Sequence, residues 1–142
     1  MRLGKADIAG LIPHAGRMCL LDEVTAWDAT TIRCLARSHR DPSNPLRAGA
    51  ELPALCGIEY AAQAMAVHGR LSSTVTERPR AGYLASVSDV VCAVRRLDDL
   101  DGDLVIEAEK RAGDEGRVQY GFTLTSNHEQ ILTGNATVVL SA

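Results

Sequence analysis

The longest apolar run in the sequence, residues 52–71 (LPALCGIEYAAQAMAVHGRL), limits the fold more than any other stretch. Pro53 suits the first position of a helix, because its missing N–H is no loss there. Apolar residues then follow at helical spacing, namely Leu55, Ile58, Ala62, Met65 and Ala66. The opposite side of the helix is apolar as well, with Ala61, Ala64 and Val67. We therefore expect a long helix buried in the centre of the fold.

Glu59 is an acid in the middle of the first apolar stripe, between Leu55 and Ala62. An acid in such surroundings is costly to ionise, so it pairs, changes its pKa or takes part in chemistry. The simpler alternative is a buried acid whose hydrogen bonds are satisfied by the backbone or by an arginine. Gln63, one turn further along the helix, could orient the carboxyl group. Glu59 is therefore the first candidate for a functional residue.

The rest of the chain is predicted to form mainly antiparallel strands. Before the long helix we expect a short helix at 6–12, a strand hairpin at 18–27 and 30–38, and a proline-containing loop at 39–51. After it we expect strands at 83–96, 104–110, 117–125 and 130–140. This order indicates an α+β fold in which a curved antiparallel sheet wraps one long central helix. Residues 1–142 are expected to form a single domain, because no repeat or linker is present.

Charge and composition exclude several classes of function. The net charge is −3, so a basic surface that neutralises nucleic-acid phosphates is not expected. No apolar run is as long as a membrane span, and the first residues lack the apolar core of a signal peptide. The four cysteines are scattered, which favours a reducing compartment and no bound metal. Acids at positions 98, 99, 101 and 103 are interpreted as solvated turn residues. The prediction is a cytoplasmic protein that binds neither nucleic acid nor membrane.

Histidine is the side chain best suited to acid–base catalysis near neutral pH, and the sequence contains four. We interpret His14 and His128 as turn residues, and His68 as a capping or exposed residue near the helix end. His39 differs, because it stands where a strand ends and the loop before the long helix begins. This position could bring its imidazole near Glu59. The sequence contains no phosphate-binding glycine loop, nucleophile elbow or zinc-protease motif.

Three segments together resemble the hotdog-fold 3-hydroxyacyl-(acyl carrier protein) dehydratases. Residues 12–24 (IPHAGRMCLLDEV) resemble the family's N-terminal "PHR-P-LL-D" stretch, and residues 52–65 (LPALCGIEYAAQAM) resemble its central-helix segment "PGVLILEAMAQA". Residues 83–109 resemble its strand pair with a "GD-L" turn. The pattern is most similar to the small hotdog dehydratases associated with aryl-polyene-type pigment gene clusters.

The resemblance implies a hotdog fold, usually dimerised so that two sheets run continuously. In the family, a histidine from the loop before the helix and a glutamate on the helix form the catalytic pair, contributed by two subunits. Glu59 matches the glutamate without a gap. The family's "HFPGHP" loop is absent, and Pro45 occupies the ungapped position of its first histidine. His39 is assigned to the catalytic role, because it lies at the same strand exit.

The activity implied is the dehydration of 3-hydroxyacyl thioesters, carried on acyl carrier protein, to trans-2-enoyl thioesters in fatty-acid or polyene biosynthesis. A neutral His39 would act as base and a protonated Glu59 as acid. Free backbone N–H groups near Ala54 and Leu55 would stabilise charge on the thioester oxygen, and Gln63 would orient Glu59. No metal or organic cofactor is required.

The expected partners are acyl carrier protein with its acyl-phosphopantetheine group, and another hotdog subunit in a homodimer or a hetero-oligomer. Arg47, Arg95 and Arg96 are candidates for contact with the acidic carrier. Two alternatives stay open at this point. A hotdog thioesterase would use the helix acid to hydrolyse the thioester without a histidine. A non-catalytic hotdog subunit would support an active dehydratase partner.

Overall fold

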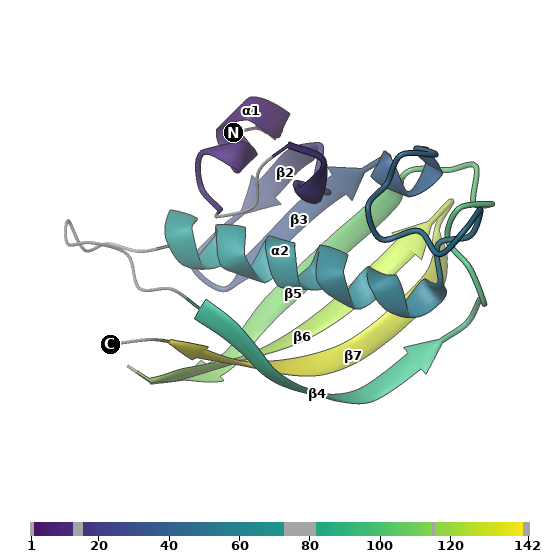
Figure 1. The fold of residues 1–142 in the computed structure, drawn as a ribbon. Helices are drawn as coiled ribbons and strands as arrows, with labels where there is room; N and C mark the ends of the chain where they lie inside the picture. Colours follow the sequence, from purple (N-terminus) through teal and green to yellow (C-terminus); the bar gives the residue numbers. More distant parts are fainter. Residues whose placement is uncertain (1, 13–15, 73–81, 115, 141–142) are drawn as a thin grey trace.

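The computed structural model describes residues 2–12, 16–72, 82–114 and 116–140. Seven strands form one antiparallel sheet. One long helix lies in the hollow of this sheet, as Figure 1 shows. The strands are β1 (Leu3–Gly4), β2 (Glu23–Trp27), β3 (Thr31–Ala36), β4 (Gly82–Cys92), β5 (Leu104–Gly113), β6 (Arg117–Ser126) and β7 (Glu129–Leu140). The helices are α1 (Lys5–Ala9) and α2 (Gly57–Leu71), with 3-10 turns at Gly16–Met18, Ser38–Arg40 and Ala54–Cys56. No helix in the described ranges is long and apolar enough to cross a lipid bilayer.

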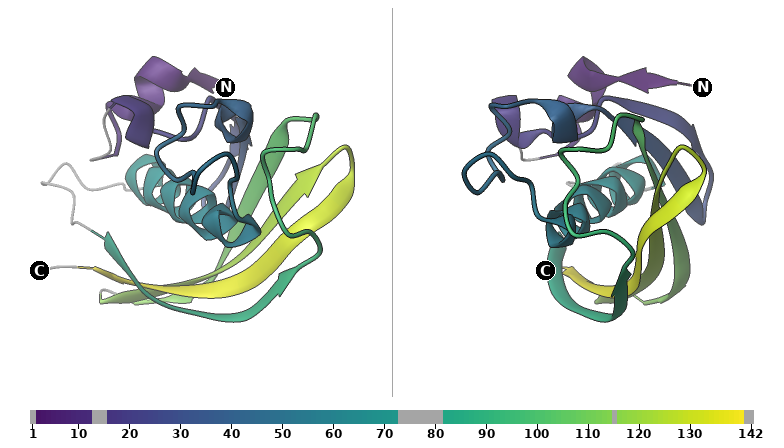
Figure 2. Two further views of the ribbon diagram at one scale, coloured as in Figure 1. Left: turned by 45° about the vertical axis from the view of Figure 1, so that its right-hand side comes forward. Right: turned by 90° about the vertical axis from the view of Figure 1, so that its right-hand side faces the viewer.

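The strands follow the order β1-β2-β3-β5-β6-β7-β4 across the sheet. The hairpins β2–β3, β5–β6 and β6–β7 are local, whereas helix α2 carries the chain across the sheet from β3 to β4 at the far edge. Figure 2 shows the sheet curling round the helix from two further directions. A curved antiparallel sheet around one long helix is the predicted α+β hotdog arrangement, and this prediction is confirmed.

The sequence predicts a helix in the centre of the fold without choosing between its two apolar sides, and the structure shows which side packs into the core. Tyr60, Ala61, Ala64 and Val67 are fully buried, whereas Leu55 just before the helix is 60% exposed. Ala62 is half-buried and Ala66 is exposed. The helix approaches the sheet closely at Gly57, where an added Cβ would lie 2.9 Å from side-chain atoms of both Leu124 and Leu132. Of the stripe around Glu59, Leu55, Ala62 and Ala66 therefore lie towards the outside, whereas Met65 is buried in the core.

Strand β4 forms one edge of the sheet and carries exposed apolar side chains. It pairs with β7 on one side only, in the described part of the chain. Its exposed apolar residues are Tyr83 (62%), Leu84 (41%), Val87 (37%) and Val91 (60%). An edge strand with unpaired backbone groups and apolar side chains is well suited to pair with a strand of another chain.

Candidate active site

His39 lies in the 3-10 turn that directly follows β3, and its side chain is fully buried. Its Nε2 atom is 3.1 Å from the carbonyl oxygen of Leu100. A carbonyl oxygen only accepts hydrogen bonds, so Nε2 carries the proton of the neutral ring. The Nδ1 atom then carries the lone pair. It is buried and has no hydrogen-bond partner among the described residues.

Burial lowers the pKa of His39, because a charged imidazolium would lose its hydration there. The positive charge of Arg40 acts in the same direction. The backbone groups of Leu100 and Gly102, and then the carboxylate of Asp103, oppose this shift without cancelling it. At neutral pH the ring is therefore neutral, which is the state required of a general base.

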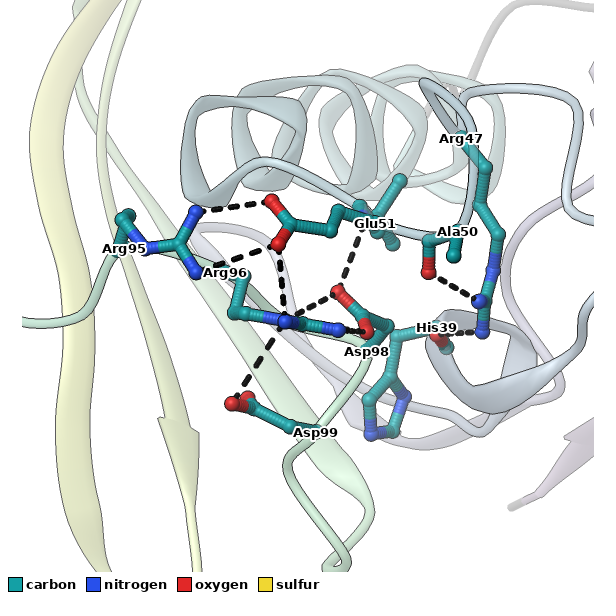
Figure 3. Close-up of polar contacts among 9 residues, drawn as sticks. His39, Arg47, Ala50, Glu51, Arg95, Arg96, Asp98 and Asp99 are labelled. Atoms are coloured by element: carbon teal, nitrogen blue, oxygen red, sulfur yellow. Dashed lines mark hydrogen bonds and ion pairs between the residues drawn. The ribbon is translucent and has the colours of Figure 1, made fainter.

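Arg47 holds the backbone around His39, as Figure 3 shows. Its guanidinium donates from Nη2 to the carbonyl oxygen of His39 at 3.2 Å, and from Nη1 to that of Ala50 at 2.9 Å. These two bonds join the histidine turn to the segment that leads into α2. Arg47 thus stabilises the loop within the chain, whereas the sequence suggested contact with a carrier protein.

Glu59 lies in the first turn of α2 and is half-buried. It shares the outward side of the helix with Leu55, Ala62 and Ala66, and the sequence did not show that this side faces away from the sheet. The reason is that α2 is apolar nearly all round, and periodicity alone does not decide which side packs inward. The outward position makes the carboxyl group reachable by a substrate or by a partner chain.

The backbone before α2 differs from the prediction of a helix start at Pro53. A 3-10 turn spans Ala54–Cys56, and the α-helix begins only at Gly57. The Ala54 N–H donates to the carbonyl oxygen of Arg95 at 3.0 Å, so it is not the free donor that we expected. The Leu55 N–H has no acceptor among the residues that the structure describes. The turn therefore offers Leu55 rather than Ala54 as an available amide.

Gln63 is fully buried and binds the N-terminal segment. Its side-chain oxygen accepts from the Leu20 N–H at 2.9 Å, and its side-chain nitrogen donates to the Met18 carbonyl oxygen at 2.7 Å. Both ends of the carboxamide therefore hold backbone groups far away in the sequence. The sequence contained no local signal for this role, because it depends on where residues 18–20 run in the folded chain.

A cluster of charged side chains fastens the start of α2 to the segment after β4 (Figure 3). Arg96 forms ion pairs with Glu51 at 2.9 Å and with Asp98. Arg95 pairs with Glu51 at 2.8 Å, and Asp98 accepts from the Leu52 N–H at 2.8 Å. The interpretation of Asp98 as a solvated turn acid is wrong, because its side chain is only 6% exposed. Arg95 and Arg96 are thus engaged by carboxylates of their own chain.

Buried polar groups also join the far end of α2 to the sheet. His68 is fully buried, with Nε2 at 2.9 Å from the Asp28 carbonyl oxygen and Nδ1 at 2.7 Å from the Tyr120 hydroxyl. The expectation of a capping or exposed histidine is therefore wrong. In the described ranges, no group of three or more His, Cys, Asp or Glu side chains could hold a metal ion.

A sequence model of the ApeP-like family, described as ApeP dehydratase, matches residues 6–141 of the chain. No curated protein sequence matches it significantly. Among solved structures, the chain is similar to the dehydratase heterocomplex ApeI:P from Xenorhabdus doucetiae, with 22% sequence identity and a TM-score of 0.84. This match covers 95% of this chain and 91% of the other.

Thioesterases are similar to the chain at lower identity. A thioesterase from Haemophilus influenzae has 10% identity and a TM-score of 0.67, with 98% of this chain and 91% of the other covered. A thioesterase variant from Pseudomonas aeruginosa has 11% identity and a TM-score of 0.60, with 82% and 78% covered. At such identities these structures establish the shared fold alone.

Proposed function

The chain belongs to the ApeP-like family of dehydratases, and on this premise we propose that it takes part in the dehydration of 3-hydroxyacyl thioesters carried on acyl carrier protein. The products would be trans-2-enoyl thioesters, as in fatty-acid or polyene biosynthesis. The observation that carries the proposal is the state of His39. One ring nitrogen is held by a backbone carbonyl, and the other is buried with no partner among the described residues.

The proposed chemistry uses His39 as base and Glu59 as acid. The Nδ1 lone pair of His39 takes the proton from C2 of the acyl chain, because C2 lies next to the thioester carbonyl and its proton is weakly acidic. The bond between C3 and the hydroxyl oxygen breaks, and the carboxyl group of Glu59 donates a proton to the departing hydroxyl. Water leaves, and the electron pair from C2 forms the new double bond.

The thioester oxygen gains negative charge as the C2 proton is removed, so it needs a fixed hydrogen-bond donor. The Leu55 N–H is proposed for this role, because the Ala54 N–H is already bonded to Arg95. Leu55 lies next to the start of α2, where the helix dipole also favours negative charge. No metal ion is required in this scheme, because the donors and the acid are protein groups.

A second hotdog subunit is proposed to complete the site. Two observations support it: the exposed apolar edge of β4, and the outward position of Glu59 beside exposed apolar residues. The similar ApeI:P structure is described as a heterocomplex, which favours a partner of a different kind. The resemblance to hotdog dehydratases implies that the histidine and the glutamate act across the interface between two subunits.

The test is an assay of the chain with its co-purified partner on a 3-hydroxyacyl group carried by acyl carrier protein. Loss of one water from the acyl chain is followed by mass spectrometry. His39→Ala and Glu59→Gln are each expected to lower kcat/KM by about 10²-fold or more. The control His128→Asn, which changes an exposed histidine, should retain activity.

A non-catalytic role is the second candidate, because His39 is fully buried in the isolated chain. If the partner kept its full rate with His39→Ala and Glu59→Gln chains, this role would replace the catalytic one. Release of a free acid that survives His39→Ala but not Glu59→Ala would instead favour a thioesterase.

A further inference from the structure

The loop that carries His39 contains little regular structure. Between β3 and the 3-10 turn at Ala54–Cys56, its backbone is closed mainly by short turn bonds, such as those from Asp41 to Ser38 and from Asn44 to Asp41. Bonds of this kind shape the loop locally, but they do not place it relative to α2. At its far end the Leu52 carbonyl oxygen accepts from the Leu97 N–H at 2.8 Å. The placement of the part around His39 relative to α2 depends on side chains that reach it from other elements.

The hydroxyl of Tyr60, in the first half of α2, provides such a contact. The Tyr60 side chain is fully buried, and its oxygen lies 2.8 Å from the Oγ of Ser38. The Nδ2 of Asn44 donates to the same oxygen at 3.1 Å, and also to the Ser38 carbonyl oxygen at 2.8 Å. Tyr60 therefore holds the loop at two points, one on each side of His39.

The direction of these hydrogen bonds follows from the available protons. Ser38 has one hydroxyl proton, and it donates to the Leu20 carbonyl oxygen at 2.7 Å. The Oγ of Ser38 must then accept from the Tyr60 hydroxyl, while the Tyr60 oxygen accepts from Asn44. Each donated proton in this network has one acceptor, so all three side chains are fixed in orientation.

The positions of these residues in the sequence give the contact its significance. Tyr60 directly follows Glu59, and Ser38 directly precedes His39. We propose that Tyr60 is a positioning residue that sets the His39 turn against helix α2, and thereby the geometry of the base. This inference rests on the proposed function, because it takes His39 to be the base.

Removal of the hydroxyl in Tyr60→Phe should loosen the His39 turn without removing His39 itself. The ring would keep its bond to Leu100, and Arg47, Arg40 and Asp103 would still surround it. A looser turn admits water, so the burial that lowers the pKa of His39 is relieved and this pKa rises. Misplacement of a base by about 1 Å can cost up to about a hundredfold in rate.

The experiment combines an NMR titration of the histidine rings in the full chain with kinetics of the chain and its partner. Tyr60→Phe should raise the pKa of His39, leave that of His68 unchanged, and lower kcat between about tenfold and a hundredfold at an unchanged KM. The matched control is Tyr120→Phe, which removes a buried hydroxyl bonded to His68. It should alter the titration of His68 and leave that of His39 as in the wild type.

Ser38 provides a second pair of variants if Tyr60→Phe folds poorly. Ser38→Ala should reproduce the effects of Tyr60→Phe on the His39 pKa and on kcat. Ser38→Thr keeps the hydroxyl and should retain the wild-type values of both. An unchanged His39 titration with kcat within about twofold of the wild type would overturn the inference. Equal losses of kcat in Tyr60→Phe and Tyr120→Phe would also overturn the inference. If the wild-type complex had no dehydratase activity, the proposed function would fail, and the titration alone would decide the role of Tyr60.

Discussion

The side-chain oxygen of Gln63 accepts a hydrogen bond from the Leu20 N–H at 2.9 Å, across 43 residues of sequence. The side-chain nitrogen of Gln63 donates to the Met18 carbonyl oxygen at 2.7 Å. The Leu20 carbonyl oxygen in turn accepts from Ser38. The N-terminal segment is therefore bound to α2 and to the His39 loop through its backbone groups, and the Gln63 carboxamide makes two of these hydrogen bonds.

The isosteric change Gln63→Glu tests this arrangement. A carboxylate cannot donate to the Met18 carbonyl oxygen, and its charge would be buried, so the variant should lose about 2–4 kcal/mol of unfolding free energy. Urea denaturation at pH 7 measures this value. Gln130→Glu is the matched control on an exposed strand position and should stay within about 0.5 kcal/mol of the wild type. Equal stability of the two variants would contradict the assigned bonds.

The buried histidines predict a loss of stability on mild acidification. Burial lowers the pKa of His68 in the folded chain, whereas an unfolded histidine titrates near about 6.5. The unfolded state therefore binds more protons below this pH. The stabilisation is fully present above about pH 6.5 and is lost as the pH falls from there towards the folded pKa.

For each such histidine the slope is at most about 1.4 kcal/mol per pH unit. Urea denaturation at pH 7.5, 6.5 and 5.5 should show this slope of the unfolding free energy against pH, and His68→Gln should reduce the slope. His128→Asn, the exposed counterpart, serves as the control. The same slope in the wild type and in His68→Gln would rule out this explanation.

The charged cluster before α2 gives a third prediction. Asp98→Asn weakens the bond to Arg96 and the anchor of the Leu52 N–H, so the melting temperature should fall by several degrees. Asp99→Asn is the control, because Asp99 is 59% exposed and lies 3.7 Å from Arg96. It should melt within about a degree of the wild type. Similar losses in both variants would mean that the cluster does not depend on Asp98.

The ion pair between Asp98 and Arg96 also affects the stability of the chain in acid. The Arg96 guanidinium holds the pKa of Asp98 well below its usual range. This contribution is therefore present above about pH 4, where an unfolded aspartate is ionised, and it is lost as the pH falls further. Asp98→Asn should flatten the decline in melting temperature below pH 4, measured by circular dichroism.

The fold could be predicted from the sequence because its signals are local. Alternating apolar residues predicted β6 and β7, and the long apolar run predicted α2. The inward face of α2 could not be predicted, because both sides of the helix are apolar. It is decided by the close approach of Gly57 to Leu124 and by the hydroxyl contacts of Tyr60, both of which involve residues far away in the sequence.

The candidate site shows the same division between local and long-range information. His39 and Glu59 could be singled out from their places at a strand exit and on a helix. The hydrogen bond from the Ala54 N–H to Arg95 could not be predicted, because it requires the segment after β4 to lie against the start of α2. The roles of Asp98 and Gln63 were missed for the same reason. Asp98 was interpreted as a solvated turn acid and Gln63 as a residue that orients Glu59, whereas both bind backbone groups far away in the sequence.

The edge strand β4 gives the last prediction, which concerns assembly. Val91 is 60% exposed on this edge, so Val91→Lys should barely change the stability of the isolated chain. If a second subunit adds a strand at β4, the new charge would be buried at the interface, and affinity should fall by about tenfold or more. Val91→Thr keeps the shape without the charge and should bind nearly as well as the wild type. Sedimentation velocity with the co-purified partner measures both affinities. Wild-type affinity in Val91→Lys would exclude β4 as the contact, because a lysine inside a strand-to-strand interface would leave an unpaired charge there.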